Sequence, residues 1–257
     1  MIKRGKNSLI LSLETATESC SVALSIDQEL IAEKYINEPK AHATILAPFI
    51  EEILKENNLT IRDLSAVAVS EGPGSYTGLR VGVSVAKGIC YASKKPLIAV
   101  NTLAVIAQCA IDNIKDGHLI TEPCPLPESG ITTIVPMIDA RRMEVYTAVF
   151  NSEGEQLTAT EAKVLNEESF SRELAEGAVL FTGNGAAKFI ELLANARIGG
   201  KKIPYYNNIY CAEQLPHASG MRIKANEAFL KQEFKDCAYF EPFYLKDFVA
   251  GKPKKLL

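Results

Sequence analysis

The sequence lacks the features of membrane, secreted and disulfide-rich proteins. No apolar run is long enough to cross a bilayer, and Glu14 and Thr15 interrupt the apolar stretch after the charged start MIKRGKNS, which argues against a signal peptide. The cysteines form no CxxC pair and lie mostly in apolar surroundings, as reduced core thiols do. They stand at Cys20, Cys90, Cys109, Cys124, Cys211 and Cys237. We therefore expect a cytoplasmic protein that does not bind a membrane.

A surplus of positive charge is also absent. Lys and Arg number 28 against 31 Asp and Glu, which gives a formal net charge of −3. Binding to nucleic acid needs clustered Lys and Arg, and only the tail with GKPKKLL is locally basic, so we expect no unaided binding of nucleic acid. With 47% hydrophobic and 23% charged residues, the 257-residue chain has an ordinary globular composition and the length of one large or two small domains.

Hydrophobic periodicity predicts three strands followed by alternating helices and strands in the first half of the chain. The predicted strands are 8–13, 20–26, 30–36, 66–69 and 96–100. The predicted helices are 42–57, a helix that follows the glycine loop and ends at about residue 93, and 102–115. The order βββαβαβα is typical of a ribonuclease-H-like lobe, a mixed sheet with helices on its faces.

The pattern partly repeats after a loop rich in Pro and Gly at residues 116–130. Strands are predicted at 131–138, 144–150, 156–164 and 179–182, and helices at 167–176, 185–196 and 225–234. The predicted fold class is α/β, with two ribonuclease-H-like lobes as in the actin and sugar-kinase (ASKHA) superfamily. Residues 1–115 form the predicted N-terminal lobe and residues 116–257 the C-terminal lobe, whose last helix is a candidate to pack back on the first lobe.

The loop EGPGSYTGLR, residues 71–80, does not match the common phosphate-binding or nucleophile motifs. A Walker loop has Lys after its second glycine, but no Lys follows Gly78. Thr77 stands where the dinucleotide motif GxGxxG has its third glycine. The nucleophile motif GxSxG fails because Pro73 and Thr77 flank Ser75, and the chain has only 3 His to act as a base. Backbone N–H groups at the start of the next helix still leave anion binding open.

The helix after this loop has an unusual surface. Gly78, Gly82 and Ala86 recur every four residues and form a smooth strip, with Val85 on a neighbouring apolar face. A helix that is apolar nearly all round must be covered on more than one side. Its own sheet supplies one cover, and the other is either the second lobe or another subunit. For the second case we expect Gly82→Glu to break pairing and leave the monomer folded. The predicted partner-binding residues are Ile45, Phe49, Gly74, Tyr76, Gly78, Gly82, Val85 and Ala86.

Several sequence blocks together resemble the TsaB (YeaZ) family. They are LILSLETATESCSVAL, AHATILAPFIEEIL, AVAVSEGPGSYTGLRVGVSVAKGICYA, PLIAVNTLAVIAQ and MIDARRMEVYTAVF, which cover most of residues 8–150. The C-terminal EPFYLKDF resembles the closing segment of the family, with Lys246 where Arg is usual, and residues 151–240 match only loosely.

The resemblance implies a two-lobed fold and a role as a scaffold subunit. Such proteins are the non-catalytic partners of a TsaD-type catalytic paralogue and a TsaE-type ATPase, which modify adenosine 37 of tRNA to threonylcarbamoyladenosine. It further implies pairing through helices of the N-terminal lobe, a homodimer when the partner is absent, and only indirect contact with tRNA.

Two departures from related enzymes concern catalysis and nucleotide binding. The catalytic paralogue holds its metal with HxxxH, but Thr102 and Ile106 occupy these positions here. Superfamily kinases have Asp-x-Gly-Thr after the first strand, where this chain has ETAT.

We therefore expect a pseudoenzyme with no catalytic residue, no metal and no tightly bound cofactor, and ATP or ADP only as a molecule shared at the partner interface. The alternatives are a glycoprotease-like hydrolase and a small-molecule kinase of the same superfamily. The candidate nucleotide or anion contacts are Glu14, Thr15, Gly72 and Arg80.

The block DARRMEVY predicts a tight, charged hairpin. Asp139, Arg141, Arg142 and Glu144 either contact the partner, the tRNA or the other lobe, or only stabilise the turn through Arg–Asp pairs. Adjacent arginines on a strand would face opposite sides, so we expect Arg142 only to stabilise the turn and leave both roles open for Arg141.

Overall fold

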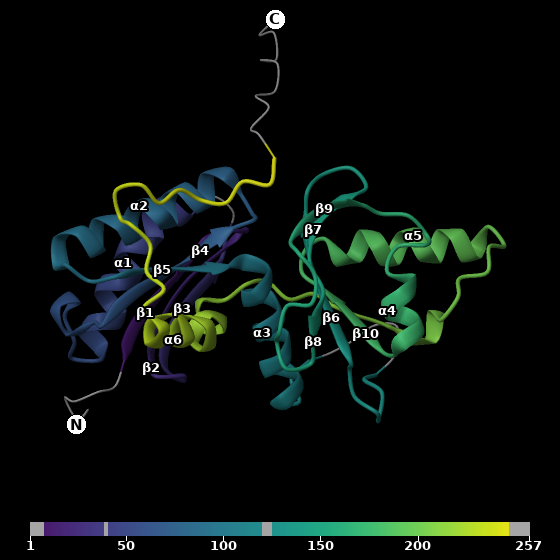
Figure 1. Ribbon diagram of the computed structural model, residues 1–257, viewed down its shortest axis with the longest axis horizontal. Helices are drawn as coiled ribbons and strands as arrows, with labels where there is room; N and C mark the ends of the chain where they lie inside the picture. The colour runs from purple at the N-terminus through teal and green to yellow at the C-terminus, as the bar shows by residue number, and fades with distance from the viewer. Residues whose placement is uncertain (1–7, 39–40, 120–124, 247–257) are drawn as a thin grey trace, which may run out of the picture.

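A computed structural model describes residues 8–38, 41–119 and 125–246, and it has two α/β lobes side by side (Figure 1). The sheet of the first lobe contains β1 (Leu9–Glu14), β2 (Ser19–Ile26), β3 (Glu29–Asn37), β4 (Ala66–Gly72) and β5 (Leu97–Asn101). The sheet of the second lobe contains β6 (Thr133–Asp139), β7 (Glu144–Thr147), β8 (Phe150–Asn151), β9 (Glu161–Val164), β10 (Val179–Thr182) and β11 (Ile209–Ala212).

The two sheets share one topology. The strand order is β3-β2-β1-β4-β5 in the first and β9-β7-β6-β10-β11 in the second, where β8 adds a short pairing to β6. In each sheet the first three strands along this path are antiparallel, and the central strand then pairs in parallel with the fourth strand, which pairs in parallel with the fifth. This duplication confirms the predicted fold of two ribonuclease-H-like lobes.

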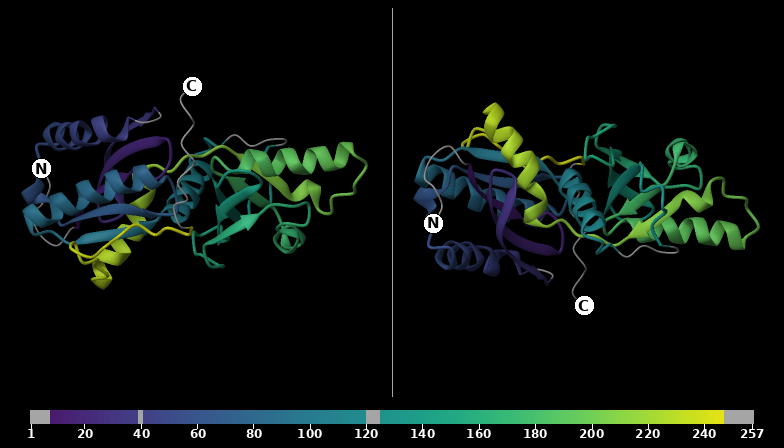
Figure 2. Two further views of the ribbon diagram at one scale, coloured as in Figure 1. Left: turned by 90° about the horizontal axis from the view of Figure 1, so that it is seen from above. Right: turned by 90° about the horizontal axis from the view of Figure 1, so that it is seen from below.

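Helices cover both faces of the first sheet. Leu9, Leu11 and Leu13 of β1 face α1 (His42–Glu56) and α2 (Tyr76–Ser93). Ile10 points to the other face, where α6 (Arg222–Lys231) packs. Figure 2 shows α1 and α6 on opposite sides of the sheet. Both faces of β1, β2 and β4 are buried, and these strands are nearly continuous apolar runs, which made them recognisable from the sequence. The edge strand β3 is largely exposed.

The helix α3 (Thr102–Lys115) lies between the lobes (Figure 1). Val105 and Cys109 belong to the core cluster of the first sheet, whereas Leu103 and Ile106 belong to a cluster with β6 and β10 of the second. The sequence analysis expected cover on two sides for the helix after the glycine loop, and α3 is a helix that is covered in this way by the two sheets. The predicted lobe boundary after residue 115 stays a prediction, because α3 packs on both sheets.

The second lobe differs in detail from its sequence-based prediction. The strand expected at 144–150 is divided into β7 and β8, the strand expected at 156–164 is limited to β9, and β11 was not predicted. The helices here are α4 (Ser171–Glu176) and α5 (Ala186–Ile198), with short 3-10 turns at Ile61–Asp63, Tyr206–Asn208 and Ala218–Met221 in the chain as a whole. Phe170, Phe181 and Phe189 form an aromatic core with ring centroids 5.0 to 5.6 Å apart.

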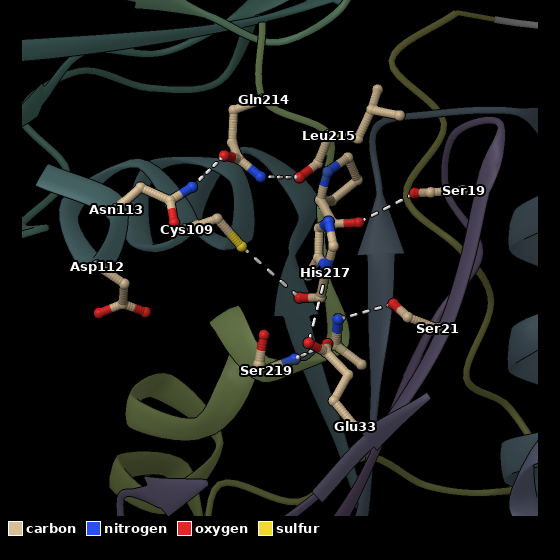
Figure 3. A network of polar contacts seen from close by, with 12 residues as sticks. Ser19, Ser21, Glu33, Cys109, Asp112, Asn113, Gln214, Leu215, His217 and Ser219 are labelled. Atoms are coloured by element: carbon tan, nitrogen blue, oxygen red, sulfur yellow. Dashed lines mark hydrogen bonds and ion pairs between the residues drawn. The ribbon is translucent and has the colours of Figure 1, made fainter. Parts of the chain in front are cut away.

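After β11 the chain returns to the first lobe through a polar network (Figure 3). Ser19 Oγ donates to the carbonyl of Pro216 (3.0 Å), and Ser21 Oγ accepts from the backbone N–H of Ala218 (2.8 Å). The His217 ring stacks on Tyr35 with centroids 4.1 Å apart. These bonds satisfy backbone groups that would otherwise be buried without partners, and they fix the start of α6 against the first sheet.

The segment after α6, which we call the C-terminal strap (residues 235–246), runs along α2 and reaches the second lobe (Figure 1). The backbone N–H of Phe243 donates to the carbonyl of Glu71 (2.6 Å), and Lys246 Nζ lies 2.5 Å from Glu144 Oε2 on β7. The strap therefore connects the glycine loop to the second sheet. Over the described residues, no helix has the length and hydrophobicity of a membrane span.

Candidate functional site

A cleft between the lobes has a volume of about 900 Å³. Its walls come from four segments that are distant in the sequence: 16–18 after β1, 73–78 of the glycine loop, 138–141 at the end of β6, and 243–246 of the strap. The lining is completed by His42, Ala43, Val81, Tyr146 and Asn184. A ligand in this cleft would contact both lobes and the strap at once.

The glycines of the loop allow α2 to pack closely on the segment after β1. A Cβ atom added to Gly78 would lie 2.1 Å from the carbonyl oxygen of Thr15, and one added to Gly82 would lie 2.3 Å from Thr15 Oγ1. A Cβ atom added to Gly74 would likewise lie 2.4 Å from the carbonyl oxygen of Ala16. The hydroxyl of Thr15 donates to the carbonyl of Gly78 (2.8 Å) and uses the space that the glycines leave.

The strip of Gly78, Gly82 and Ala86 is therefore an internal surface. All three residues are buried, and their cover is this chain's own first loop and sheet. The prediction that they contact a partner is wrong, because periodicity identified the residues that share a face but not the direction of that face. Because a side chain at Gly82 would meet Thr15, we expect Gly82→Glu to disturb the folding of the monomer itself. Gly74 lies in the cleft wall and packs on Ala16.

The outward side of α2 carries a different set of small and apolar residues. Ser84 and Gly88 are exposed, and a Cβ atom added to Gly88 would meet nothing within 4 Å. Tyr91 is 73% exposed. Val81 and Val85 are half-exposed on α2, and Ile45 and Phe49 are half-exposed on α1, which packs against α2. We define the helical face as Ile45, Phe49, Val81, Ser84, Val85 and Gly88.

An aromatic cluster joins the glycine loop to the strap. Tyr76 and Tyr244 have ring centroids 5.0 Å apart, and the guanidinium carbon of Arg80 lies 4.1 Å from the Tyr76 centroid. Arg80 Nε also donates to the hydroxyl of Tyr244 (3.3 Å). Tyr76, a predicted partner contact, thus lines the cleft beside the strap.

The four candidate nucleotide contacts do not line the cleft. Glu14 and Thr15 are fully buried beneath it. Gly72, at φ +113°, is covered by the strap, because a Cβ atom there would lie 2.5 Å from the carbonyl oxygen of Phe243. Arg80 turns to Tyr76 and Tyr244. The segment after β1 that approaches the cleft is 16–18, and nucleotide contact by these four residues stays a prediction.

Glu14 has a buried carboxyl group, and only one of its two oxygens accepts hydrogen bonds from the described residues. Its Oε1 accepts from the backbone N–H of Ala16 (2.6 Å) and from Ser70 Oγ (2.8 Å), whereas Oε2 has no partner among the described residues. Burial raises the pKa of Glu14 to about 7, although the hydrogen bonds from Ala16 and Ser70 act to lower it. The first loop is thus built around a carboxyl group that favours its neutral form.

We expect Glu14 to make folding stability depend on pH. The folded chain keeps the proton up to about pH 7, whereas the unfolded chain releases it near the ordinary value of 4.5. The stabilisation by the neutral carboxyl is complete below pH 4.5 and is lost as pH rises through 7, by as much as about 3 kcal/mol. Glu14→Gln should abolish this loss. Urea unfolding at about pH 5 and pH 8 measures it, with the exposed Glu153→Gln as control. Equal pH dependence of wild type and Glu14→Gln would contradict the assignment.

The DARR block forms a tight turn between β6 and β7. Arg141 and Arg142 have φ values of +69° and +47°, so they occupy the turn and not a strand, and the prediction that they face opposite sides of a strand is wrong. Asp139 Oδ1 accepts from the backbone N–H of Arg141 (2.6 Å) and pairs with Lys188 Nζ (2.6 Å). The ion pair with Asp139 that was expected from an arginine is therefore made by Lys188. Arg141 lines the cleft.

The described residues bring together no activated nucleophile or metal cluster. Ser75 caps α2 by accepting from the backbone N–H of Gly78 (3.3 Å). His42 Nε2 lies 2.8 Å from the carbonyl oxygen of Thr17, so it donates to backbone and does not serve Ser75. Thr102 and Ile106 are buried in α3. In the described part of the chain, no three His, Cys, Asp or Glu residues are grouped to hold a metal ion.

Comparison with known proteins places these features in a family context. The family model described as TsaD, tRNA N6-adenosine threonylcarbamoyltransferase, matches residues 29–254. The chain is 35% identical over 141 residues to the tRNA threonylcarbamoyladenosine biosynthesis protein TsaB of Escherichia coli (strain K12), a match that spans 55% of this chain and 54% of that protein. It is 28% identical over 258 residues to TsaB of Haemophilus influenzae, with 96% of this chain and 97% of that protein covered.

Solved structures agree with the sequence matches. YeaZ from Pseudomonas aeruginosa superimposes with a TM-score of 0.71 at 27% identity, over 93% of this chain and 100% of that one. A second Pseudomonas aeruginosa structure, described as similar to peptidase YeaZ, gives a TM-score of 0.72 at 28% identity with the same coverage. The likeness therefore extends over both lobes and is not confined to the N-terminal blocks.

Proposed function

The chain belongs to the TsaD family, in which it resembles the TsaB (YeaZ) proteins, and from this premise we propose that it is a non-catalytic subunit in the synthesis of tRNA threonylcarbamoyladenosine. In this role it pairs with a TsaD-type catalytic paralogue, works with a TsaE-type ATPase, and contributes no reacting group. Contact with tRNA is indirect, and two copies of this chain pair when the paralogue is absent.

The observation that carries this proposal is the helical face. Val81 and Val85 remain half-exposed, although α1 and α2 already cover one face of the sheet. Ser84 and Gly88 beside them have small side chains, so the backbone of another helix could approach closely there. Apolar and small residues of this kind favour helix packing against a partner. Val81 also lines the cleft, so a partner bound to this face would lie beside the cleft.

The positions that correspond to the metal ligands of the catalytic paralogue support a role without catalysis. The positions that would carry HxxxH hold Thr102 and Ile106, both buried with 0% exposure. We place any site for ATP or ADP at the interface with the paralogue. Glu14, Thr15, Gly72 and Arg80, the nucleotide contacts expected within this chain, do not line its cleft.

Reconstitution of tRNA modification tests the proposal. The isolated chain should form no threonylcarbamoyladenosine, and neither should the paralogue with the ATPase, whereas all three together should modify tRNA. Calorimetry with ATP on the isolated chain tests the kinase alternative. Tight ATP binding, or full modification without this chain, would contradict the proposed role.

A further inference from the structure

Two cysteines that are distant in the sequence meet where the strap crosses α2. Cys90 lies on the buried side of α2 with 2% of its surface exposed, and Cys237 of the strap is half-buried against the same core cluster. The thiol of Cys237 is within hydrogen-bonding reach of the thiol of Cys90. The pair connects a helix that contributes to the helical face with the segment that lines the cleft.

Contacts on both sides hold this pair in place. Lys87, one turn before Cys90, donates from Nζ to the backbone carbonyls of Ala238 (3.2 Å) and Phe240 (3.0 Å). These bonds fix the strap against the turn of α2 that carries Cys90. Phe240 is half-buried in the same cluster as Cys237, whereas most neighbouring strap residues are exposed.

The backbone around Cys237 is a tight turn. Asp236 Oδ1 accepts from the backbone N–H groups of Ala238 (2.7 Å) and Tyr239 (3.2 Å), and the carbonyl of Asp236 accepts from the N–H of Phe240 (2.8 Å). Just before it, the N–H of Lys235 donates to the carbonyl of Leu97 (2.8 Å). The turn directs the side chains of Cys237 and Phe240 toward the core cluster that contains Cys90. The folded backbone therefore places the two thiols close together.

We propose that Cys90 and Cys237 are a peroxide-sensitive thiol pair, which oxidation joins in a disulfide that ties the strap to α2. The sulfur of Cys237 attacks one oxygen of hydrogen peroxide, the O–O bond breaks, and Cys237 sulfenic acid and water form. The sulfur of Cys90 then attacks the sulfur of Cys237. The S–O bond breaks, and the leaving hydroxide takes the proton of Cys90 as a second water. Two thiols lose two electrons and one peroxide is reduced.

The order of these steps follows from exposure. Cys237 is half-exposed and meets the oxidant, whereas Cys90 is shielded by the core. Burial, followed by the neighbouring Cys237, raises the pKa of Cys90 to about 12. A thiol with this pKa is a poor first nucleophile. Cys90 therefore acts second, where its proximity to Cys237 compensates for its low reactivity.

Peptide mapping of the full chain tests this inference. After titration with hydrogen peroxide, the remaining thiols are alkylated in denaturant and the chain is digested with trypsin without reductant. Cleavage after Lys and Arg places Cys90 in peptide 88–94 and Cys237 in peptide 236–246, each with one cysteine. We expect the two peptides linked, with a mass two hydrogens below their sum, and released by dithiothreitol.

Two variants complete the test. Cys237→Ser, at a half-exposed position, should abolish the linked peptide, whereas Cys211→Ser on β11 should leave it unchanged. Hydrogen exchange in residues 236–244 should slow in the oxidised wild type. The inference is overturned if Cys237 is recovered alkylated, overoxidised or linked to another cysteine while Cys90 is recovered alkylated.

Discussion

Gly78→Val is expected to cost about 4 kcal/mol of the free energy of unfolding or to prevent folding. The first added carbon would lie 2.1 Å from the carbonyl oxygen of Thr15, a backbone atom that cannot rotate away. The same side chain would break the hydrogen bond from the Thr15 hydroxyl to the carbonyl of Gly78. The first loop and α2 would then have to separate, and with them the wall of the cleft.

Gly88→Ala on the same helix is the matched control. Its new Cβ atom meets nothing within 4 Å, and alanine is a better helix former than glycine. We therefore expect a gain of about 0.5 to 1 kcal/mol. Urea unfolding followed by circular dichroism measures both variants. Equal stability of Gly78→Val and wild type would show that α2 does not pack on the first loop as described.

Ser84→Glu is expected to weaken pairing with the TsaD-type paralogue by about 100-fold or more, or about 2.7 kcal/mol. Ser84 is exposed between half-exposed valines on the helical face, so a glutamate there would carry a charge into an apolar contact. The folded chain should tolerate the change, because this side of α2 is open to solvent. Calorimetric titration of the paralogue measures the affinity.

Ser152→Glu is the control for this experiment. Ser152 is also exposed, but it lies in a turn after β8 of the second lobe, away from α1 and α2. It adds the same charge and should leave the affinity within about twofold of wild type. If Ser152→Glu weakened pairing as much as Ser84→Glu, net charge and not the helical face would determine the binding.

The first lobe was predictable because its signals are local. The strands at 8–13 and 20–26 are apolar runs buried on both faces, and Ser75 and Asn101 cap the helices that follow their loops. The C-terminal part of the second lobe was less predictable. The strand β11 has only four residues and depends on its pairing with β10, which a local pattern does not reveal.

The site was predicted only in outline, because its walls depend on contacts between distant segments. Periodicity grouped Gly78 with Gly82, but only the position of Thr15 decides that this face is internal. Phe243, Tyr244 and Lys246 line the cleft because the strap returns to Glu71 and Glu144. The block EPFYLKDF was the one available signal for this segment, and it gave no indication of where the strap would pack.

Hydrogen exchange of the chain with and without the TsaD-type paralogue tests the central claim most directly. The account predicts a complex in which amide exchange slows in α1 and in the exposed side of α2, around Ser84 and Gly88, while α4 and α5 exchange as in the free chain. Protection confined to the second lobe, or no stable complex at all, would contradict a scaffold that docks through the helical face.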